Sequence, residues 1–154
     1  MNKLLLLILL CFGLNASVVA AELRVGDDLP AITLKNQHDN LITVAADVQT
    51  LLFVVEKPAG EVLSGYLKKH PDDFLISKKA YFMADISGMP SMVIQMFALP
   101  TMRKRPWSAL LGYSASELAF MPHQKDHVTV VKLKAGKVDE ILFINNEAAL
   151  AANF

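Results

Sequence analysis

Two apolar runs that do not alternate with polar residues constrain the fold of this chain most strongly. The first covers residues 50–55, and the second covers residues 80–86 and is apolar except for Asp85 near its end. A strand with one solvated face alternates apolar and polar side chains, whereas an unbroken apolar strand is covered on both faces. The two runs therefore predict central strands of one sheet that has packing layers on both sides.

The segments around these strands predict helices and hairpins. Apolar side chains at helical spacing predict helices, and paired short runs around turn residues predict hairpins. The expected helices cover 61–69, 89–102 and 146–151, the expected hairpins pair 31–34 with 41–44 and 128–133 with 138–144, and short strands are expected within 106–113 and 118–121. This order predicts an α/β domain with a mixed β-sheet and helices on both faces.

The first 21 residues predict a secretory signal peptide. Lys3 gives a positive start, residues 4–14 form an apolar run, and small residues lead to Ala21 ahead of the acidic Glu22. This is the order of a cleavable export signal, and the run is too short for a bilayer span of roughly 20 apolar residues. We expect cleavage between Ala21 and Glu22, which leaves a single domain over residues 22–154 in a bacterial periplasm.

The charge of the chain argues against nucleic acid as the main partner. Lysine and arginine total 15, and aspartate and glutamate also total 15. Domains that bind nucleic acid carry an excess of positive charge, because phosphate contacts supply much of their affinity. No apolar run after residue 21 is long enough to span a membrane. The expected partner is an unidentified periplasmic protein or a small ligand.

Three segments of the chain carry a resemblance to a known family. They are residues 25–34 (Val-Gly-Asp-Asp-Leu-Pro-Ala-Ile-Thr-Leu), the Pro-Trp-Ser of 106–108, and the hairpin around Lys-Ala-Gly-Lys at 134–137. The first is similar to the entry pattern of the redoxin branch of the thioredoxin-like superfamily, and the others resemble periplasmic proteins of the YtfJ type. The resemblance covers residues 23–150 and implies a thioredoxin-like fold.

The resemblance makes the missing cysteines informative. In redoxins the reactive cysteines lie in the loop and first helical turn after the central strand, and here residues 56–61 read Glu-Lys-Pro-Ala-Gly-Glu. The one cysteine of the chain, Cys11, lies in the predicted signal peptide. The cis-proline position of the fold falls at Lys125 or Asp126. Thiol–disulfide exchange and thiol peroxidase chemistry need a thiolate, so we expect the mature protein to perform neither.

No other catalytic constellation is visible in the sequence. A serine nucleophile needs a base and an orienting acid, and no Gly-x-Ser-x-Gly motif accompanies Ser64, Ser87 or Ser91. No glycine-rich phosphate loop precedes a helix. We therefore expect no catalytic residues and no cofactor, and a binding or accessory role rather than an enzymatic one.

A methionine stripe has two interpretations. Met89, Met92 and Met96 fall at i, i+3 and i+7, so one helical face can carry all three. Methionine is a flexible filler of cores, and the apolar neighbours of these residues favour a packed face. The alternative is a periplasmic copper-binding protein with a methionine and histidine surface, because Cu(I) prefers thioether and imidazole ligands.

A basic cluster has two interpretations as well. Arg103, Lys104 and Arg105 end the expected helix, next to Trp107. Three positive charges can attract an acidic partner, but they also complement the negative carboxyl end of a helix. We favour the second interpretation and expect Trp107 in the core.

The expected binding surface is the place of the redoxin active site. It combines the loop 57–61 with the loop 122–127, which the fold would bring together although about 60 residues separate them. Ligands of open α/β sheets bind beyond the carboxyl ends of strands, where the first loop lies. The candidate binding residues are Lys57, Pro58, Glu61, His123 and His127.

Overall fold

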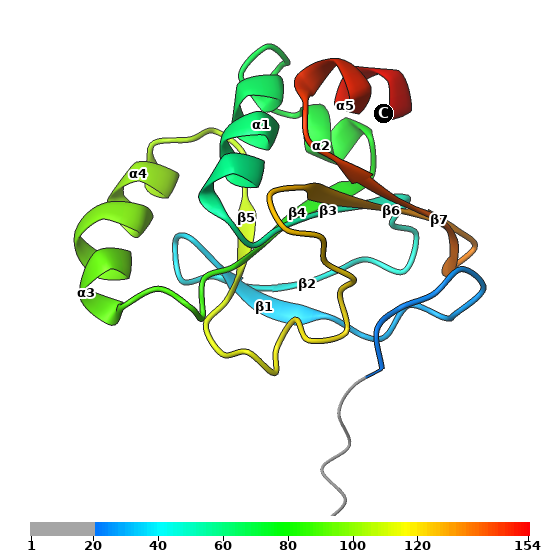
Figure 1. The fold of residues 1–154 in the computed structure, drawn as a ribbon, viewed down its shortest axis with the longest axis horizontal. Helices are drawn as coiled ribbons and strands as arrows, with labels where there is room; N and C mark the ends of the chain where they lie inside the picture. Colours follow the sequence, from blue (N-terminus) through cyan, green and yellow to red (C-terminus); the bar gives the residue numbers. More distant parts are fainter. Residues whose placement is uncertain (1–20) are drawn as a thin grey trace, which may run out of the picture.

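The two unbroken apolar runs form adjacent central strands of one seven-stranded sheet (Figure 1). The computed structural model describes residues 21–154, so the predicted signal peptide lies outside the described residues except for Ala21. The strands are β1 (Thr33–Asn36), β2 (Leu41–Thr43), β3 (Thr50–Val54), β4 (Ala80–Asp85), β5 (Ala109–Gly112), β6 (Val128–Lys134) and β7 (Lys137–Ile144). The helices are α1 (Lys57–Leu67), α2 (Phe74–Ser77), α3 (Ser91–Val93), the π-helix η1 (Ile94–Ala98), α4 (Leu99–Arg103) and α5 (Glu147–Asn153).

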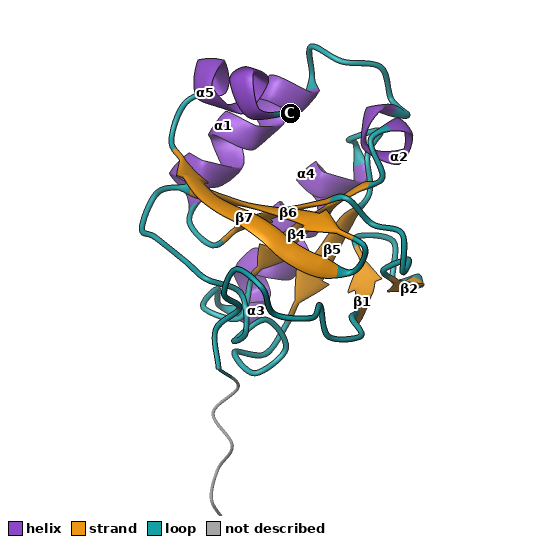
Figure 2. Cartoon of the chain, turned by 90° about the vertical axis from the view of Figure 1, so that its right-hand side faces the viewer, coloured by secondary structure: helices purple, strands orange, loops and turns teal. Residues whose placement is uncertain are grey.

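The sheet is mixed, as the sequence predicts. Its strand order is β2-β1-β5-β4-β3-β6-β7, and β3, β4 and β5 run parallel while the other neighbouring pairs are antiparallel. Figure 2 shows α1, α2 and α5 above the sheet and several loops below it. Ile94 of η1 and Leu99 of α4 are buried in the same core as α1 and α5. The predicted α/β fold class is confirmed.

Side chains of β3 alternate between two hydrophobic cores. Leu52 and Val54 point into the core that α1 and α5 close, with Leu63 and Leu150 fully buried there. Leu51 and Phe53 point into the second core, which is closed by residues 23–34 and by residues 118–121. Burial on both sides explains why β3 lacks polar alternation.

Helix α1 begins at Lys57, four residues before the start expected from the sequence. The segment 57–60 was expected to be a loop because it contains Pro58 and Gly60. Proline is well tolerated in the first turn of a helix, where its missing N–H has no intrahelical partner and its fixed φ suits the helix. The candidate site is therefore built on a helix terminus rather than on a loop.

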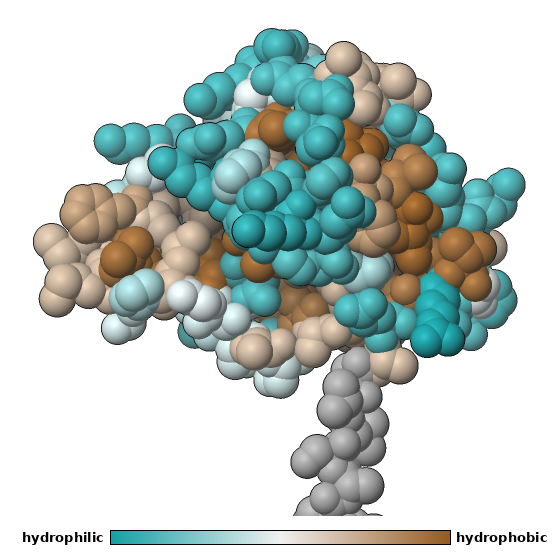
Figure 3. Space-filling view, in the orientation of Figure 1, coloured by the Kyte–Doolittle hydropathy of each residue, from teal (hydrophilic) through white to brown (hydrophobic). Residues whose placement is uncertain are grey.

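The segment 91–103, which joins α3, η1 and α4, forms an arm at the left of Figure 1. Only two of its side chains, Ile94 and Leu99, are buried. Met92 and Met96 are 69% and 61% exposed, so the expectation that they belong to a packed face is wrong. Figure 3 shows the apolar colours that gather over this end of the molecule.

The π-helix also interrupts the helical spacing on which the methionine stripe was based. Met89 lies before the start of α3, where its N–H donates to the Ile86 carbonyl over 3.0 Å. The five residues of η1 then follow a wider turn than the 3.6-residue period of an α-helix. The three methionines therefore do not form one continuous stripe.

The carboxyl-terminal hairpin agrees closely with its sequence. Ala135 and Gly136 form the two-residue turn with φ values of 51° and 77°. Turns of this kind match the twist of the flanking strands, and glycine adopts positive φ without cost. After β7, the Asn146 side chain accepts from the Ala149 N–H over 2.8 Å and caps α5 as expected.

Two other expectations need correction. The strand expected from residue 106 begins only at Ala109, and residues 118–121 form turns rather than a strand. Leu118 and Met121 are apolar because they seal the second core. Within residues 21–154, none of the helices has the length and apolar character that a membrane crossing requires.

Candidate functional site

Glu56 joins the two segments that the sequence predicts to form one surface. It is the N-cap residue of α1, directly beyond the carboxyl end of β3. Its Oε1 lies 2.9 Å from Nε2 of His123, and its Oε2 accepts from the backbone N–H of Asp126 over 3.2 Å. The start of α1 and the loop 122–127 therefore lie side by side, as expected for a redoxin-like arrangement.

The surroundings of Glu56 favour its ionised form. Partial burial acts in the opposite direction, because it penalises the charged carboxylate. The hydrogen bonds from His123 and from the Asp126 N–H, together with the charge of His123, outweigh burial and lower the pKa of Glu56. Glu56 is thus held as a carboxylate that bridges two segments.

The loop 122–127 is fixed by contacts of its own. The buried Thr129 hydroxyl donates to the Pro122 carbonyl over 2.8 Å. Asp126, one of the two residues at the expected cis-proline position, has a φ of 60° and directs its N–H at Glu56. His127 places Nδ1 2.7 Å from the Lys125 carbonyl, within its own loop. His123 therefore contacts the start of α1 through Glu56, and His127 has no such contact among the described residues.

The first turn of α1 presents charge to solvent. Lys57 and Glu61 form an exposed i,i+4 ion pair at 3.6 Å. Such pairs contribute little to stability, because water screens them. Pro58 is exposed, whereas Ala59 is buried beneath the turn. Lys57 and Glu61 are consequently free to exchange their contact for one with a ligand.

A cleft of about 310 Å³ opens at the carboxyl ends of β3 and β4. We call it the α1 cleft. One wall is the start of α1, with Glu56, Lys57, Gly60 and Glu61. The other wall is formed by residues after β4 and by the end of the arm, namely Asp85, Ile86, Met89, Thr101, Met102 and Arg105. This is the edge where open α/β sheets bind ligands.

Arg105 is a cleft residue that the sequence placed in a basic cluster. Its Nη1 donates to the Ser64 hydroxyl over 2.6 Å, and its guanidinium lies 5.9 Å from the centre of the Trp107 ring. Burial lowers the pKa of the Arg105 guanidinium. Arg105 therefore ties the end of the arm to α1.

Arg103 ties the arm to the first hairpin. It donates from Nε to the Gln37 carbonyl over 2.7 Å and from Nη2 to Asp39 over 3.1 Å. Lys104 is exposed, and among the described residues its side chain forms no hydrogen bond or ion pair, unlike those of the other two basic residues. The cluster thus fastens the arm, and the expectation of a core position for Trp107 is confirmed.

Sequence reasoning named Lys57, Pro58 and Glu61 but not Glu56, Asp85 or Arg105. Glu56 follows the apolar run of β3, and Asp85 follows the last apolar residue of β4. In both cases the signal in the sequence was a charged residue at the end of a buried strand. Asp85 accepts from the Ser87 N–H over 2.9 Å, which shapes the turn beside the cleft. The sequence has no comparable signal for Arg105, since its contact with Ser64 joins residues 41 positions apart.

The chemistry available in the α1 cleft is that of ion pairs and apolar contact. Residues 21–154 contain no cysteine. Within the same residues, no three histidine, cysteine, aspartate or glutamate side chains gather closely enough to hold a metal ion. What the cleft offers a ligand is charge at its rim and methionine side chains on its inner wall.

Comparison with solved structures decides the fold. The thioredoxin domain of a thiol-disulfide oxidoreductase from Bacteroides vulgatus superposes with a TM-score of 0.53 at 15% identity, covering 86% of this chain and 99% of that one. The fold is thioredoxin-like. Peroxidoxin BcpB from Mycobacterium tuberculosis gives a TM-score of 0.54 at 12% identity, covering 85% of this chain and 94% of its own. A thio-disulfide isomerase from Thermus thermophilus gives 0.52 at 16% identity, covering 84% and 94%. No protein-family model matches the sequence, and neither does any curated protein.

Proposed function

We propose that the protein is exported through cleavage after Ala21 and works in the periplasm as a non-catalytic binding module. The observation that carries this proposal is the first turn of α1, where Lys57, Pro58 and Gly60 stand in the segment that holds the reactive cysteines of redoxins. Thiol exchange needs a thiolate at this turn, and none is available. The cleft beside it nevertheless remains open.

The arm supports a protein as the partner. Met92, Met96 and Phe97 are all more than 60% exposed, and Met89 and Met102 continue this apolar material into the α1 cleft. Exposed apolar patches on soluble proteins commonly mark interaction sites, and methionine adapts to differently shaped partners. The proposed partner is a polypeptide that lays apolar side chains on the arm and polar groups along the rim at Lys57 and Glu61.

Site-specific photocrosslinking in the periplasm tests this proposal. A photoreactive amino acid at Phe97 is expected to give a discrete crosslinked protein, because Phe97 is 64% exposed on the arm. The matched control is Leu41, an apolar residue with 69% exposure on the edge strand β2. Equal products at both positions, or none at Phe97, would contradict a binding surface at the arm.

The same partner allows a test of the cleft rim. We expect the double substitution Lys57→Ala and His123→Ala to weaken binding about tenfold or more, which corresponds to about 1.4 kcal/mol. The matched control is Lys68→Ala with His38→Ala, since both residues are exposed and lie outside the cleft. Unchanged affinity in the first variant, with a loss in Lys104→Ala, would move the site to the basic cluster.

Cu(I) binding is a second candidate, favoured by the exposure of Met92 and Met96. Two thioethers four residues apart on a helical segment are available to a soft ion, whereas Met89 lies in the α1 cleft. Competition against a colorimetric Cu(I) chelator tests it. Binding that disappears in the variant Met92→Leu with Met96→Leu would support a copper site, and no competition by the unchanged protein would reject it.

A further inference from the structure

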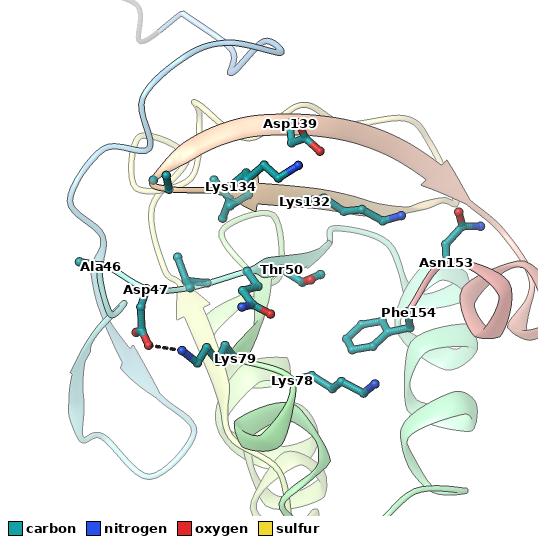
Figure 4. Close-up of a pocket in the computed structure, with 15 residues that line it drawn as sticks. Ala46, Asp47, Thr50, Lys78, Lys79, Lys132, Lys134, Asp139, Asn153 and Phe154 are labelled. Atoms are coloured by element: carbon teal, nitrogen blue, oxygen red, sulfur yellow. Dashed lines mark ion pairs between the residues drawn. The ribbon is translucent and has the colours of Figure 1, made fainter.

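A larger hollow lies at the opposite end of the sheet from the α1 cleft (Figure 4). Its volume is about 670 Å³. Thr50 begins β3 there, Lys79 directly precedes β4, and the antiparallel strand β6 ends there at Lys134. The carboxyl end of α5 forms another wall. We call this hollow the lysine cleft.

Four lysines from two distant segments line the lysine cleft, namely Lys78, Lys79, Lys132 and Lys134. Figure 4 shows Lys132 and Lys134 extending from the strand on one side of the hollow and Lys78 from the other side. The lining includes the carboxylates of Asp47 and Asp139, and Glu140 lies against Lys132, so the positive charge of the four lysines exceeds these carboxylates by one. Such an arrangement attracts anions.

Two of the four lysines already have carboxylate partners. Lys79 pairs with Asp47 at 2.7 Å, and Lys132 pairs with Glu140 at 3.0 Å. Lys78 and Lys134 form no ion pair with any residue of the described chain. Lys78 instead lies 5.8 Å from the centre of the Phe74 ring. The two unpaired ammonium groups are the ones available to an anionic ligand.

An apolar cavity of about 520 Å³ adjoins the lysine cleft. The two hollows share Asp47, Val48 and Lys79 in their walls, so the Asp47–Lys79 ion pair lies at their junction. The remaining walls of the cavity are mostly apolar and include Leu75, Ile76, Tyr81, Trp107 and Leu110.

The indole N–H of Trp107, which lines the cavity, is a buried hydrogen-bond donor without a partner in residues 21–154. Trp107 is 6% exposed, and its Nε1 has no hydrogen-bond partner among the described residues. Buried donors are nearly always paired with protein or water, and each unpaired one calls for an explanation. An occupant with an oxygen near Trp107, or an ordered water beside it, would supply one.

We propose that the lysine cleft and the adjoining cavity together bind an anionic amphiphile. Its phosphate or carboxylate head lies between Lys78 and Lys134, and its hydrocarbon part passes the Asp47–Lys79 junction into the cavity. The lysines of the first hollow suit a charged head, and the apolar walls of the second suit a hydrocarbon chain. This site is separate from the α1 cleft, and it does not depend on the binding function proposed above.

Fluorescence of Trp107 provides a direct test, because the chain has one tryptophan and it lines the cavity. The probe is n-octyl phosphate below its micelle concentration, compared with inorganic phosphate and n-octanol. We expect a saturable change with octyl phosphate, and binding that strengthens about fourfold for each added CH₂ from hexyl to octyl phosphate. Affinity equal to that of phosphate alone, or to that of octanol alone, would overturn the proposal.

Variants separate the head from the tail. Lys78→Ala with Lys134→Ala is expected to weaken octyl phosphate about tenfold, at about one factor of three for each ammonium group, and to leave octanol unchanged. The control Lys35→Ala with Lys68→Ala removes the same charge at exposed positions outside both hollows. An equal loss of affinity in the control would show that only the net charge of the protein matters, and would reject the site.

The cavity is tested with Ile76→Asp, because Ile76 lines its rim and is 80% exposed, so we expect a charge there to leave the protein folded. This variant should lose the dependence of affinity on chain length. An unchanged dependence would place the hydrocarbon elsewhere and overturn the proposal. Co-sedimentation with phosphatidylglycerol vesicles would assign the amphiphile to a membrane lipid, and binding of free octyl phosphate alone would assign it to a diffusible molecule. Both results support the site.

Discussion

The carboxylate of Glu56 holds together two segments that lie about 70 residues apart in the sequence. Both of its oxygens lie near Nε2 of His123, at 2.9 and 3.0 Å, and Oε2 also accepts from the Asp126 N–H. A neutral glutamine keeps the shape of this side chain but gives up its charge. Charge-assisted hydrogen bonds are the stronger kind, so the bridge should depend on ionisation.

We predict that Glu56→Gln destabilises the protein by about 1 kcal/mol at neutral pH. The folded-state pKa of Glu56 lies below its ordinary value of 4.5. The ionised carboxylate therefore stabilises the fold above that value, and this contribution is lost as the pH falls through the lowered pKa. Melting temperatures of both proteins between pH 3 and 7 should differ most at the upper end and converge at the lower end. A constant difference would show that charge is not involved.

Two glycines give a matched pair of substitutions with opposite expected signs. A Cβ at Gly112 would lie 2.8 Å from Cδ1 of Leu118, which is itself buried in the second core. We predict that Gly112→Ala costs about 1–3 kcal/mol, because neither side can yield easily. A Cβ at Gly60 in α1 meets nothing within 4 Å, so Gly60→Ala should stabilise by about 0.5–1 kcal/mol. Urea unfolding measures both, and equal signs would contradict this account.

Among the elements, the arm departs most from ordinary helix packing. Its apolar residues outnumber the positions that it buries, which are Ile94 and Leu99. An apolar side chain that contacts only water adds nothing to the stability of the isolated protein. The exposed methionines and Phe97 should therefore contribute little to folding, which leaves them available for the binding proposed above.

We predict that Met92→Ser, Met96→Ser and Phe97→Ser each change the unfolding free energy by less than about 0.5 kcal/mol. Leu99→Ala, a truncation within the core, should cost about 2–5 kcal/mol. Chemical unfolding of the purified variants distinguishes the two groups. Large losses in the serine variants would mean that the arm packs its methionines, as their spacing in the sequence first indicated.

The elements that the sequence predicted correctly are those in which one local rule decides the structure. The apolar runs of β3 and β4, the Ala135–Gly136 turn and the Asn146 cap belong to this group. The arm was misjudged because periodicity reports that a helix has an apolar face, but not what covers that face. The start of α1 was misjudged because proline suits both a loop and a first helical turn.

The candidate site shows the same limit over longer distances. The resemblance to redoxins predicted that residues 57–61 and 122–127 lie together, and the Glu56 contacts agree. Arg105 joins the cleft through Ser64, and the lysine cleft gathers side chains from residues 78–79 and 132–134. Such groupings arise from strand order and register, which no short motif encodes.

At the scale of the whole molecule, the sheet has a different kind of hollow at each end. The α1 cleft lies at the carboxyl ends of β3 and β4, beside the apolar arm. The lysine cleft lies at their amino ends, about the full length of the strands away. If both proposals hold, a protein partner and a small ligand could be bound at once, and the sheet that separates the two hollows would provide a rigid support.

We predict that the protein is exported in a form that contains no thiol. Mass spectrometry of the mature form should match a chain that begins at Glu22, and a thiol-reactive dye should not label it, because Cys11 is the one cysteine of the sequence. Such a protein should neither reduce insulin disulfides nor consume peroxide above a buffer blank.

The variant Lys57→Cys provides a positive control for thiol accessibility. Its thiol would lie at the exposed start of α1, where the helix dipole lowers a thiol pKa, and it should react readily with the same dye. Labelling of the unchanged mature protein would overturn the cleavage site. Turnover that survives removal of contaminating enzymes would overturn the non-catalytic function.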